Sequence, residues 1–390
     1  MLEFPKILRD IDALGRERAE SFAEIPEQMG RAERTLTRMG EDVEGARARI
    51  EGAKTSWLLA DFDEDPRIAR DPVPLPPQHA VVASDGSQIV PGKHDVTFCY
   101  LLNASYIILY YGNCERPVAR TIPKLFYREE DLVEDPYGGK RMQVNEKLLG
   151  MKRTIEEARA IEQAIRAARA SGIPTVALWD GSLIRWTLEN EPADYRDRTL
   201  EEYLKVFDTA REMGVPIAGY ISDPGSRDLC NCVKVMLCDQ EPIDCDRCSH
   251  KAAGEIPPCE GVGRLKDSSL FKERLRGGKR SVLFGSRSSI LDRYREHRVG
   301  AFYVDAGLEV VRIEVPEWVA SDVGMMDLVH GVCLDQAVKG RGYPIALSEA
   351  HEHAVIHGAD RKAFYEMVER SFLKHGAKIT YSLKRISKGY

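Results

Sequence analysis

The chain has 390 residues, 43% of them hydrophobic, and a formal net charge of −6. This length allows two or three domains, or one core with large insertions, and the hydrophobic content is enough for a sizeable core. The longest apolar run, at 96–111, falls short of the ~18 residues that span a bilayer. The charged N-terminus lacks the apolar segment of a signal peptide, so we expect a soluble cytoplasmic protein. The acidic balance also excludes a protein that is basic throughout, as many nucleic-acid binders are.

The composition changes several times along the chain. Residues 1–60 are highly charged and carry apolar residues at helical spacing, which predicts an N-terminal helical region. Residues 61–79 are rich in Pro and Asp, which indicates a linker. We expect one domain over 80–375, with a cysteine-rich insertion at 228–262 and a C-terminal tail at 376–390.

From residue 80 onward, strand and helix patterns follow one another. Strands are expected at 80–89, 96–111, 116–125, 175–179, 215–221, 301–304 and 310–315. Helices are expected at 145–171, 200–213, 327–340 and 351–375. Several strands, then alternating helices and strands, are typical of an α/β fold with a mixed sheet.

Two of the predicted strands end in the same tripeptide, Asp-Gly-Ser, which begins at Asp85 and again at Asp180. Ligand sites of open α/β sheets lie just beyond the carboxyl ends of strands, and Gly leaves room for a ligand or metal there. The competing interpretation is that each Asp-Gly is only a turn. The helix between the two strands offers a third carboxylate, which we assign to Glu157. Its nearest rival is Glu156, and a solvent-facing glutamate without a role is the alternative.

Clustered carboxylates suit one reaction class in particular. Three of them make a hard oxygen site for Mg²⁺ or Mn²⁺. Two such ions about 4 Å apart stabilise both the attacking and the leaving oxygen in phosphodiester hydrolysis.

Three segments, in the order VVASDGSQ, ALWDGSL and GYPIALSEAHEHAV, resemble the NurA nuclease family over roughly residues 80–370. The resemblance implies an RNase H-like core and DNA cleavage with Mn²⁺ or Mg²⁺, as an exonuclease and, as a second option, a single-strand endonuclease. It further implies a homodimer that works with a HerA-like hexameric ATPase translocase in DNA-end resection and double-strand break repair.

The site residues that carry over are Asp85, Asp180 and a helix glutamate, which we place at Glu157. His351, in the third motif, is the expected fourth member, either as a metal ligand or acting on the scissile phosphate. A buried histidine with a purely structural hydrogen bond is the alternative for His351.

A basic stretch stands out in the otherwise acidic chain. Residues 261–300 hold eleven Lys or Arg and four Asp or Glu. Within RGGKRSVLFGSRSS we expect Arg276, Lys279, Arg280 and Arg287 to contact DNA phosphates, which would give affinity without sequence choice. A solvated charged surface is the competing interpretation.

Six of the nine cysteines fall within thirty residues, and such a cluster in a cytosolic chain favours a metal over disulfides. They are Cys230, Cys232, Cys238, Cys245, Cys248 and Cys259. The pair Cys245 and Cys248 resembles half of a zinc knuckle, and Cys238 with Cys259 would complete a structural Cys₄ zinc site. The first two cysteines would then be spare. Alternatively an Fe–S cluster would use a different four, and His250 is a further possible ligand.

These features favour a nuclease that uses Asp85, Glu157, Asp180 and His351. A different class is a non-catalytic, metal-stapled scaffold that binds DNA or a translocase. A third hypothesis is an actin-like or sugar-kinase-like phosphotransferase, because Asp-Gly-Ser after a strand also suits phosphate binding. The chain has no P-loop or nucleotide fingerprint, and the order of the motifs favours the nuclease.

Overall fold

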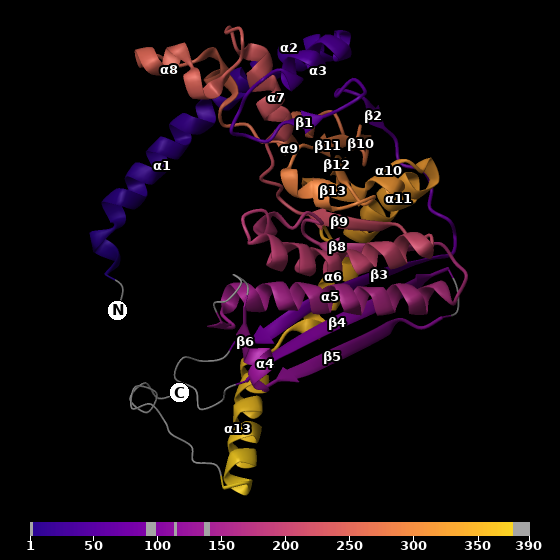
Figure 1. The fold of residues 1–390 in the computed structure, drawn as a ribbon. Coiled ribbons are helices and arrows are strands. Elements are labelled where there is room, and N and C mark those ends of the chain that lie inside the picture. The colour runs from indigo at the N-terminus through magenta and orange to yellow at the C-terminus, as the bar shows by residue number, and fades with distance from the viewer. Residues whose placement is uncertain (1–2, 91–98, 113–114, 136–140, 377–390) are drawn as a thin grey trace. The chain divides into compact units, whose positions relative to one another are not determined.

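The computed structural model describes residues 3–90, 99–112, 115–135 and 141–376, and the chain divides into two compact units (Figure 1). Unit 1 consists of Met1–Pro72, Ile221–Ser288 and Gly300–Ile313. Unit 2 consists of Val73–Tyr220, Ser289–Val299 and Glu314–Tyr390. The division does not follow chain order, so the single domain expected over 80–375 contributes to both units. In the described part of the chain, no helix has the length and apolarity needed to cross a membrane.

Unit 2 is built on a five-stranded mixed sheet in the order β9-β8-β3-β4-β5. The strands are β3 (His79–Ile89), β4 (Tyr100–Tyr111), β5 (Val118–Phe126), β8 (Thr175–Asp180) and β9 (Ile217–Ile221). β3, β4 and β5 are antiparallel neighbours, whereas β8 runs parallel to both β3 and β9. Three antiparallel strands followed by two parallel ones form an RNase H-like core, so the predicted α/β class with a mixed sheet is confirmed.

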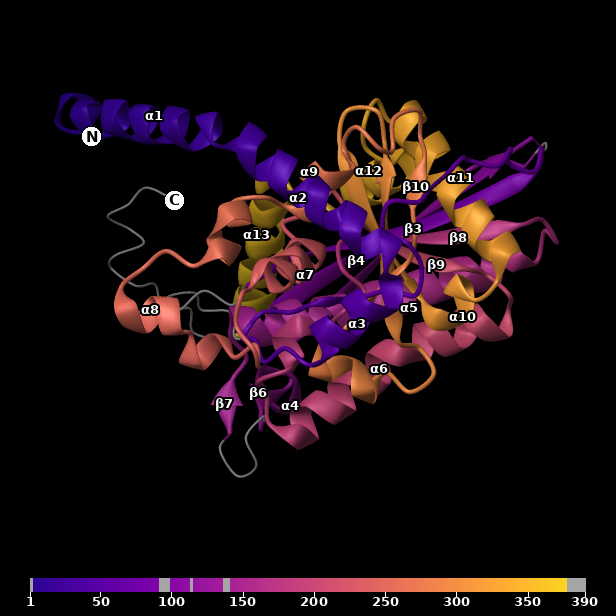
Figure 2. The same cartoon turned by 90° about the horizontal axis from the view of Figure 1, so that it is seen from above.

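Helices cover both faces of this sheet. The longer helices of unit 2 are α5 (Glu146–Arg169), α6 (Ala193–Glu212), α11 (Val323–Lys339), α12 (Ile345–Ala354) and α13 (Gly358–Lys374). α5 packs on one face of β3 and β4, and α12 packs on the other (Figure 2). α5 begins at the cap Asn145, whose side chain accepts from Leu148 N, and it buries an apolar face that includes Ile161 and Ile165.

Short elements complete unit 2. They are α4 (Glu129–Leu132), β6 (Val133–Glu134), β7 (Met142–Gln143), η2 (Trp186–Leu188), η5 (Ser289–Arg293) and α10 (Glu317–Ala320). The helix expected at 351–375 is interrupted at residues 355–357, which separate α12 from α13. α13 extends away from the sheet in Figure 1, and Phe364 is its buried residue. All but one residue of the expected tail at 376–390 lie outside the described residues.

Unit 1 combines helices with short strands. Its helices are η1 (Phe4–Lys6), α1 (Leu8–Ala23), α2 (Ile25–Glu41), α3 (Val43–Glu51), α7 (Asp228–Leu237), η3 (Cys245–Arg247), α8 (Ser249–Ala253), η4 (Pro258–Val262) and α9 (Asp267–Phe271). Its strands are β1 (Ala60–Asp61), β2 (Ala69–Arg70), β10 (Arg280–Ser281), β11 (Phe284–Ser286) and most of β12 (Val299–Asp305) and β13 (Val310–Pro316). Val299 and the last three residues of β13, among them Glu314, belong to unit 2. The helices expected in residues 1–60 are therefore present.

The segment 61–79 differs from the expected linker. β1 pairs with β11, and β2 pairs with β10, both antiparallel. Ala60 and Phe62 are buried in the core of unit 1, beside residues of α2 and α7. The proline-rich segment therefore contains two short strands, which are held by pairing with distant parts of the chain.

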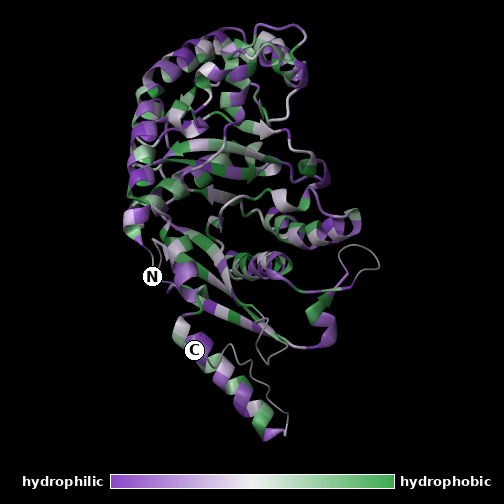
Figure 3. Ribbon diagram, turned by 90° about the vertical axis from the view of Figure 1, so that its left-hand side faces the viewer, coloured by the Kyte–Doolittle hydropathy of each residue, from purple (hydrophilic) through white to green (hydrophobic). Residues whose placement is uncertain are grey.

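Figure 3 shows how hydropathy is distributed over the ribbon: hydrophobic residues are concentrated on the strands, and hydrophilic residues are frequent on the outer helices.

Candidate active site

Asp85 and Asp180 are side by side on neighbouring parallel strands. Ser84 of β3 is opposite Trp179 of β8, so the next residue along each strand is one of the two aspartates. β8 ends at Asp180, whereas β3 continues to Ile89, paired only with β4 beyond Ser84. Asp85 therefore lies inside its strand and not at its end, contrary to expectation. Because β8 ends at Asp180, β3 has no neighbouring strand on that side beyond this point in the described part of the chain, and both carboxylates lie beside the gap.

Successive residues of β3 face different helices, as the pleat of a strand requires. Ser84 donates from Oγ to the backbone oxygen of Glu157 in α5 at 3.1 Å. Ser87, by contrast, donates to the backbone oxygen of the last residue of α12. A Cβ at Gly86 would lie 2.7 Å from Glu157 Oε1. The missing side chain at Gly86 thus leaves the space that the Glu157 carboxylate occupies, while Asp85 faces α12.

The two candidate glutamates of α5 have different partners. Glu156 is buried and forms ion pairs with Lys124 and with Arg159, the latter at 2.7 Å. Glu157 has a side chain that is 12% exposed, and its Oε1 lies 3.0 Å from Arg153 Nε. The charges of both aspartates act on Glu157. The structure therefore places Glu157, and not Glu156, beside the aspartate pair.

Negative charge is crowded at this position, where Glu157 and Asp85 are partly buried and Asp180 is exposed. Burial raises the pKa of Glu157 to about 7; Arg153 lowers it, and the two aspartates raise it further. Burial also raises the pKa of Asp180, whereas a hydrogen bond from the Tyr343 hydroxyl lowers it and Asp85 raises it. Because neighbouring carboxylates raise the pKa of Glu157 and of Asp180, a divalent cation among them would favour their charged forms.

His351 joins the cluster from α12. Its Nδ1 lies 2.7 Å from Asp85 Oδ2, and its side chain is 62% exposed. α12 is docked on the sheet by Ser105 of β4, which donates from Oγ to the backbone oxygen of Ala350 at 2.6 Å. The exposure argues against the buried structural histidine. With a proton on Nδ1, His351 donates to Asp85, and Nε2 remains as an acceptor or metal ligand.

The turn after β8 is held by buried polar groups. Gly181 takes a left-handed backbone conformation with φ of 87°, which favours glycine. Glu314 of β13 is 1% exposed and accepts from Ser182 Oγ at 2.7 Å and from Leu183 N at 2.9 Å. The hydroxyl of Tyr294 donates to the backbone oxygen of Leu183 at 3.0 Å. These bonds fix the backbone that follows Asp180 and so keep its carboxylate beside the end of the sheet.

The family comparison covers this whole site. A family model described as the NurA domain matches residues 79–356. This chain belongs to the NurA domain family. All three motifs that suggested the resemblance lie within the match, as do Asp85, Glu157, Asp180 and His351.

The similarity to solved structures is low. The NurA nuclease from Sulfolobus solfataricus is 14% identical, with a TM-score of 0.47, over 92% of this chain and 98% of that one. The catalytic domain of human endonuclease V is 12% identical, with a TM-score of 0.30, over 74% and 84%. LC9-RNase H1 is also 12% identical, with a TM-score of 0.18, over 52% and 88%. A search of curated proteins finds no match. These values are too low to carry an argument about activity.

The donors of the NurA-domain site fit a hard divalent ion. Carboxylate oxygens with one imidazole suit Mn²⁺ or Mg²⁺, and the mutual repulsion of the carboxylates favours a cation among them. Within the described residues, the four side chains do not bring three donor atoms within 4.8 Å of one another. Two of the carboxylates are instead paired with protein groups, Asp85 with His351 and Glu157 with Arg153.

A second cluster in the described part of the NurA domain does meet that spacing. It consists of Asp208, Glu296 and His297. His297 is fully buried; its Nδ1 lies 3.2 Å from Trp318 Nε1 and its Nε2 lies 2.8 Å from Asp208 Oδ1. Because an indole N–H can only donate, Nδ1 is the acceptor and Nε2 carries the proton given to Asp208. Both ring nitrogens are therefore engaged, and Glu296 pairs with Arg211. We interpret this cluster as a structural network.

The four basic residues expected to contact DNA belong to unit 1 and differ in exposure. Arg280 is 8% exposed, with its guanidinium 6.0 Å from the centre of the Phe302 ring, so burial withdraws it from contact with DNA phosphates. The other three have acidic partners: Arg276 with Glu273, Lys279 with Asp71 and Arg287 with Asp61. Of these, Arg276 is the most exposed, so it is the strongest remaining candidate.

The cysteines separate into two groups. Cys238, Cys245, Cys248 and Cys259 are partly buried and line one pocket of unit 1. The other two, on α7, are fully buried in the core, where burial raises the pKa of each thiol. The four residues assigned to a structural metal thus line the same pocket, and the two core cysteines do not line it.

Sequence reasoning missed several groups around the carboxylates. Tyr343 lies within the third motif, and Arg153 precedes Glu157 by one helical turn. Both positions could therefore have been predicted from the sequence to lie near the carboxylates. Glu314 also had one, as an acidic residue in an otherwise apolar strand. Arg185 had none; its guanidinium lies over the rings of Trp179 and Tyr203, at 5.6 and 4.9 Å from their centres.

Proposed function

We propose that this protein is a divalent-metal-dependent DNA nuclease that hydrolyses phosphodiester bonds. The observation that carries the proposal is the convergence of Asp85, Glu157, Asp180 and His351 where β8 ends. Membership of the NurA domain family supports DNA as the substrate. The non-catalytic scaffold is less well supported, because a scaffold has no need of three neighbouring carboxylates that repel one another.

Each residue of the site then has a role. Asp85, Glu157 and Asp180 would hold Mn²⁺ or Mg²⁺, with His351 as the fourth member. The bound ion would supply Lewis-acid stabilisation of phosphate oxygens and lower the pKa of the attacking water. Asp85 orients the His351 ring through Nδ1, so that Nε2 can bind the ion or hold a proton near the scissile phosphate. The carboxylate of Asp180 is held by the Tyr343 hydroxyl.

We place the activity in DNA-end resection and double-strand break repair, with exonuclease cleavage as the main mode and single-strand endonuclease cleavage as a second. A homodimer and a HerA-like hexameric ATPase are the partners proposed. Lys279, Arg287 and above all Arg276 would add phosphate contacts that are independent of sequence.

The test is cleavage of end-labelled linear DNA by the purified full-length chain. We expect degradation with Mn²⁺ or Mg²⁺, none with EDTA, and none with Asp180→Asn, which keeps a hydrogen-bond acceptor for Tyr343 while removing the charge. DNA binding should persist in this variant. If the unaltered protein cuts with neither ion, even beside a HerA-like translocase, the nuclease proposal fails and the scaffold takes its place.

A further inference from the structure

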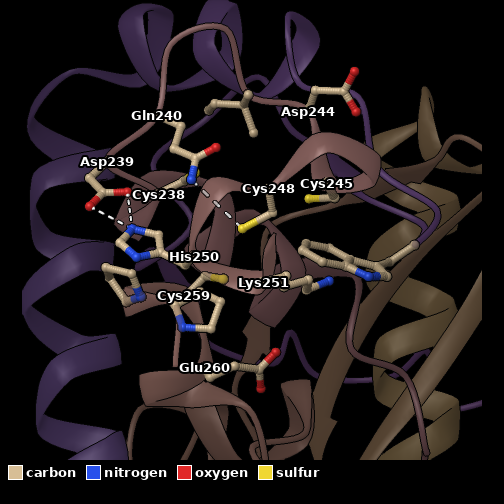
Figure 4. Close-up of a pocket in the computed structure, with 14 residues that line it drawn as sticks. Cys238, Asp239, Gln240, Asp244, Cys245, Cys248, His250, Lys251, Cys259 and Glu260 are labelled. Atoms are coloured by element: carbon tan, nitrogen blue, oxygen red, sulfur yellow. Dashed lines mark hydrogen bonds and ion pairs between the residues drawn. The ribbon is translucent and has the colours of Figure 1, made fainter. Parts of the chain in front are cut away.

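A small cavity in unit 1 is lined by four sulfur atoms from separate short elements (Figure 4). Cys238 follows the last residue of α7, Cys245 begins η3, Cys248 precedes the first residue of α8, and Cys259 lies in η4. The cavity has a volume of about 20 Å³, which is room for about one water-sized particle. Four cysteines of a thirty-residue segment thus line a space that fits a single ion, although no three of these sulfur atoms lie within 4.8 Å of one another in the described residues.

The remaining cysteines of the segment cannot reach this cavity. Cys230 and Cys232 are 1% and 0% exposed on α7, where they pack among apolar residues of the unit 1 core. Cys232 Sγ lies 3.4 Å from the backbone oxygen of Ala60. They are inert core residues, so a site that uses a different set of four is excluded.

His250 lines the cavity but is engaged elsewhere. Its Nε2 lies 3.0 Å from each carboxylate oxygen of Asp239, and its Nδ1 lies 3.1 Å from Glu255 Oε2. A ligand histidine needs one ring nitrogen free for the metal. Both nitrogens of His250 are in use, which leaves the four sulfurs as the donor set.

The chain around the cavity has little apolar core of its own. Between residues 238 and 262, the buried residues are Ile243, Pro257 and Val262. Hydrogen bonds anchor the loop at two places: Cys245 N donates to Lys54 O at 3.0 Å, and an Arg49 guanidinium N–H donates to the backbone oxygen of Cys238 at 2.7 Å. Ordering this many residues costs conformational entropy that so little burial does not offset, so the loop needs a cross-link.

One polar contact reaches a sulfur directly. Gln240 Nε2 lies 3.7 Å from Cys248 Sγ, within donating distance for a sulfur acceptor. Lys251 also lines the cavity, and its positive charge would offset part of the negative charge of clustered thiolates. Such donors and cations around sulfur are the usual outer partners of a thiolate-bound metal.

We infer that Cys238, Cys245, Cys248 and Cys259 bind one structural Zn²⁺ ion that holds the loop at 238–262 in its fold. Four thiolates in closed coordination are typical of structural zinc, and each thiol releases its proton to solvent on binding. A cavity for one ion favours zinc over an iron–sulfur cluster, which brings several irons and sulfides. The site is independent of DNA cleavage, because no carboxylate of the NurA-domain site lines it.

The test measures metal and not activity. The full-length protein, purified without added metal, is analysed by elemental mass spectrometry, and we expect about one zinc ion per chain. A mercurial that blocks thiols should release this zinc. Cys245→Ser and Cys259→Ser should lose it, whereas Cys230→Ala, the matched change on α7, should keep it.

Three results would overturn the inference. They are a protein without zinc, a protein with the visible absorbance of an iron–sulfur cluster, and zinc retained in both serine variants. If the serine variants fail to fold, the unaltered protein still decides: zinc must leave as the mercurial modifies Cys238, Cys245, Cys248 and Cys259, which peptide mass spectrometry identifies, before the buried pair on α7 reacts.

Discussion

The carboxylate site and the cysteine loop are held in place by different kinds of structure. Asp85 and Asp180 lie on neighbouring strands of the unit 2 sheet, and buried side chains such as Glu314 fix the turn beyond. The four cysteines instead lie in or beside elements of three to five residues, apart from α7. One site is built on a sheet and the other on loops.

This difference bears on what each metal would do. Strand pairing holds the carboxylates together without an ion, and burial together with the two aspartates raises the pKa of Glu157. The cysteine loop buries too little apolar surface to order itself, so metal binding there would contribute to folding. Loss of the ion should therefore cost activity at the first site and structure at the second.

The largest expected effect is at Glu157. Glu157→Gln removes the charge that faces the two aspartates and should abolish cleavage of linear DNA, with folding retained. Glu156→Gln is the matched control, because its carboxylate pairs with Lys124 and Arg159 instead. Gel assays with Mn²⁺ compare the two; equal activities, or loss confined to Glu156→Gln, would contradict the placement of the third carboxylate.

His351→Ala should lower the cleavage rate by about 10²- to 10⁴-fold, the range for a positioned acid–base group. The neighbouring His353→Ala serves as control, since it removes an exposed imidazole from the same helix. Single-turnover rates at saturating Mn²⁺ separate the two variants. A His351→Ala enzyme as fast as the control would show that the contact with Asp85 is incidental.

Gln240→Ala tests the loop without touching a ligand. Removing the donor to Cys248 should weaken zinc binding by about 10- to 100-fold, as for other outer partners of a bound metal. Competition with a chromogenic zinc chelator measures this. Asp239→Asn, whose side chain contacts His250 and not a sulfur, should leave the affinity near that of the unaltered protein. A similar loss in both variants would mean that general loop disorder, and not the contact to sulfur, sets the affinity.

The smallest change is a single methyl group at Gly86. A Cβ there would lie 2.7 Å from Glu157 Oε1 and 2.9 Å from Arg153 Cγ. Gly86→Ala should therefore displace the carboxylate and slow cleavage, and the overpacking should lower the free energy of unfolding by about 1–3 kcal/mol. Gly150→Ala, with nothing within 4 Å of the new Cβ, is the control and should keep full activity. Full activity in both variants would show that the space at Gly86 is not needed to position the Glu157 carboxylate.

Local sequence patterns predicted the two aspartates of the carboxylate site. Asp85 and Asp180 each follow an apolar run, and the register of parallel β3 and β8 then brings them together. Glu157 was harder, because adjacent helical residues differ by about 100° around the axis and only packing decides which faces the sheet. In the structure, Gly86 leaves space on the α5 side of the sheet for Glu157 and not for Glu156. No periodicity in the sequence predicts this space.

Other features were beyond local patterns. β1 and β2 have two residues each and exist through pairing with β11 and β10, more than two hundred residues away, so a proline-rich segment was read as a linker. Burial of Arg280 depends in the same way on the pairing of β10. The cysteine spacing suggested which four cysteines line the cavity. That Cys230 is a core residue became clear only from the fold of α7, and that His250 is engaged elsewhere became clear only from its contacts with Asp239.

The most direct measurement follows both metals in one sample. The full-length protein is passed by gel filtration into metal-free buffer, and its zinc content and cleavage of linear DNA are measured before and after adding Mn²⁺. We expect no cleavage until Mn²⁺ is added, with about one zinc per chain throughout. Cleavage in metal-free buffer, or its absence with Mn²⁺ while zinc stays bound, would contradict the carboxylate site. Zinc lost during filtration would contradict the cysteine site alone.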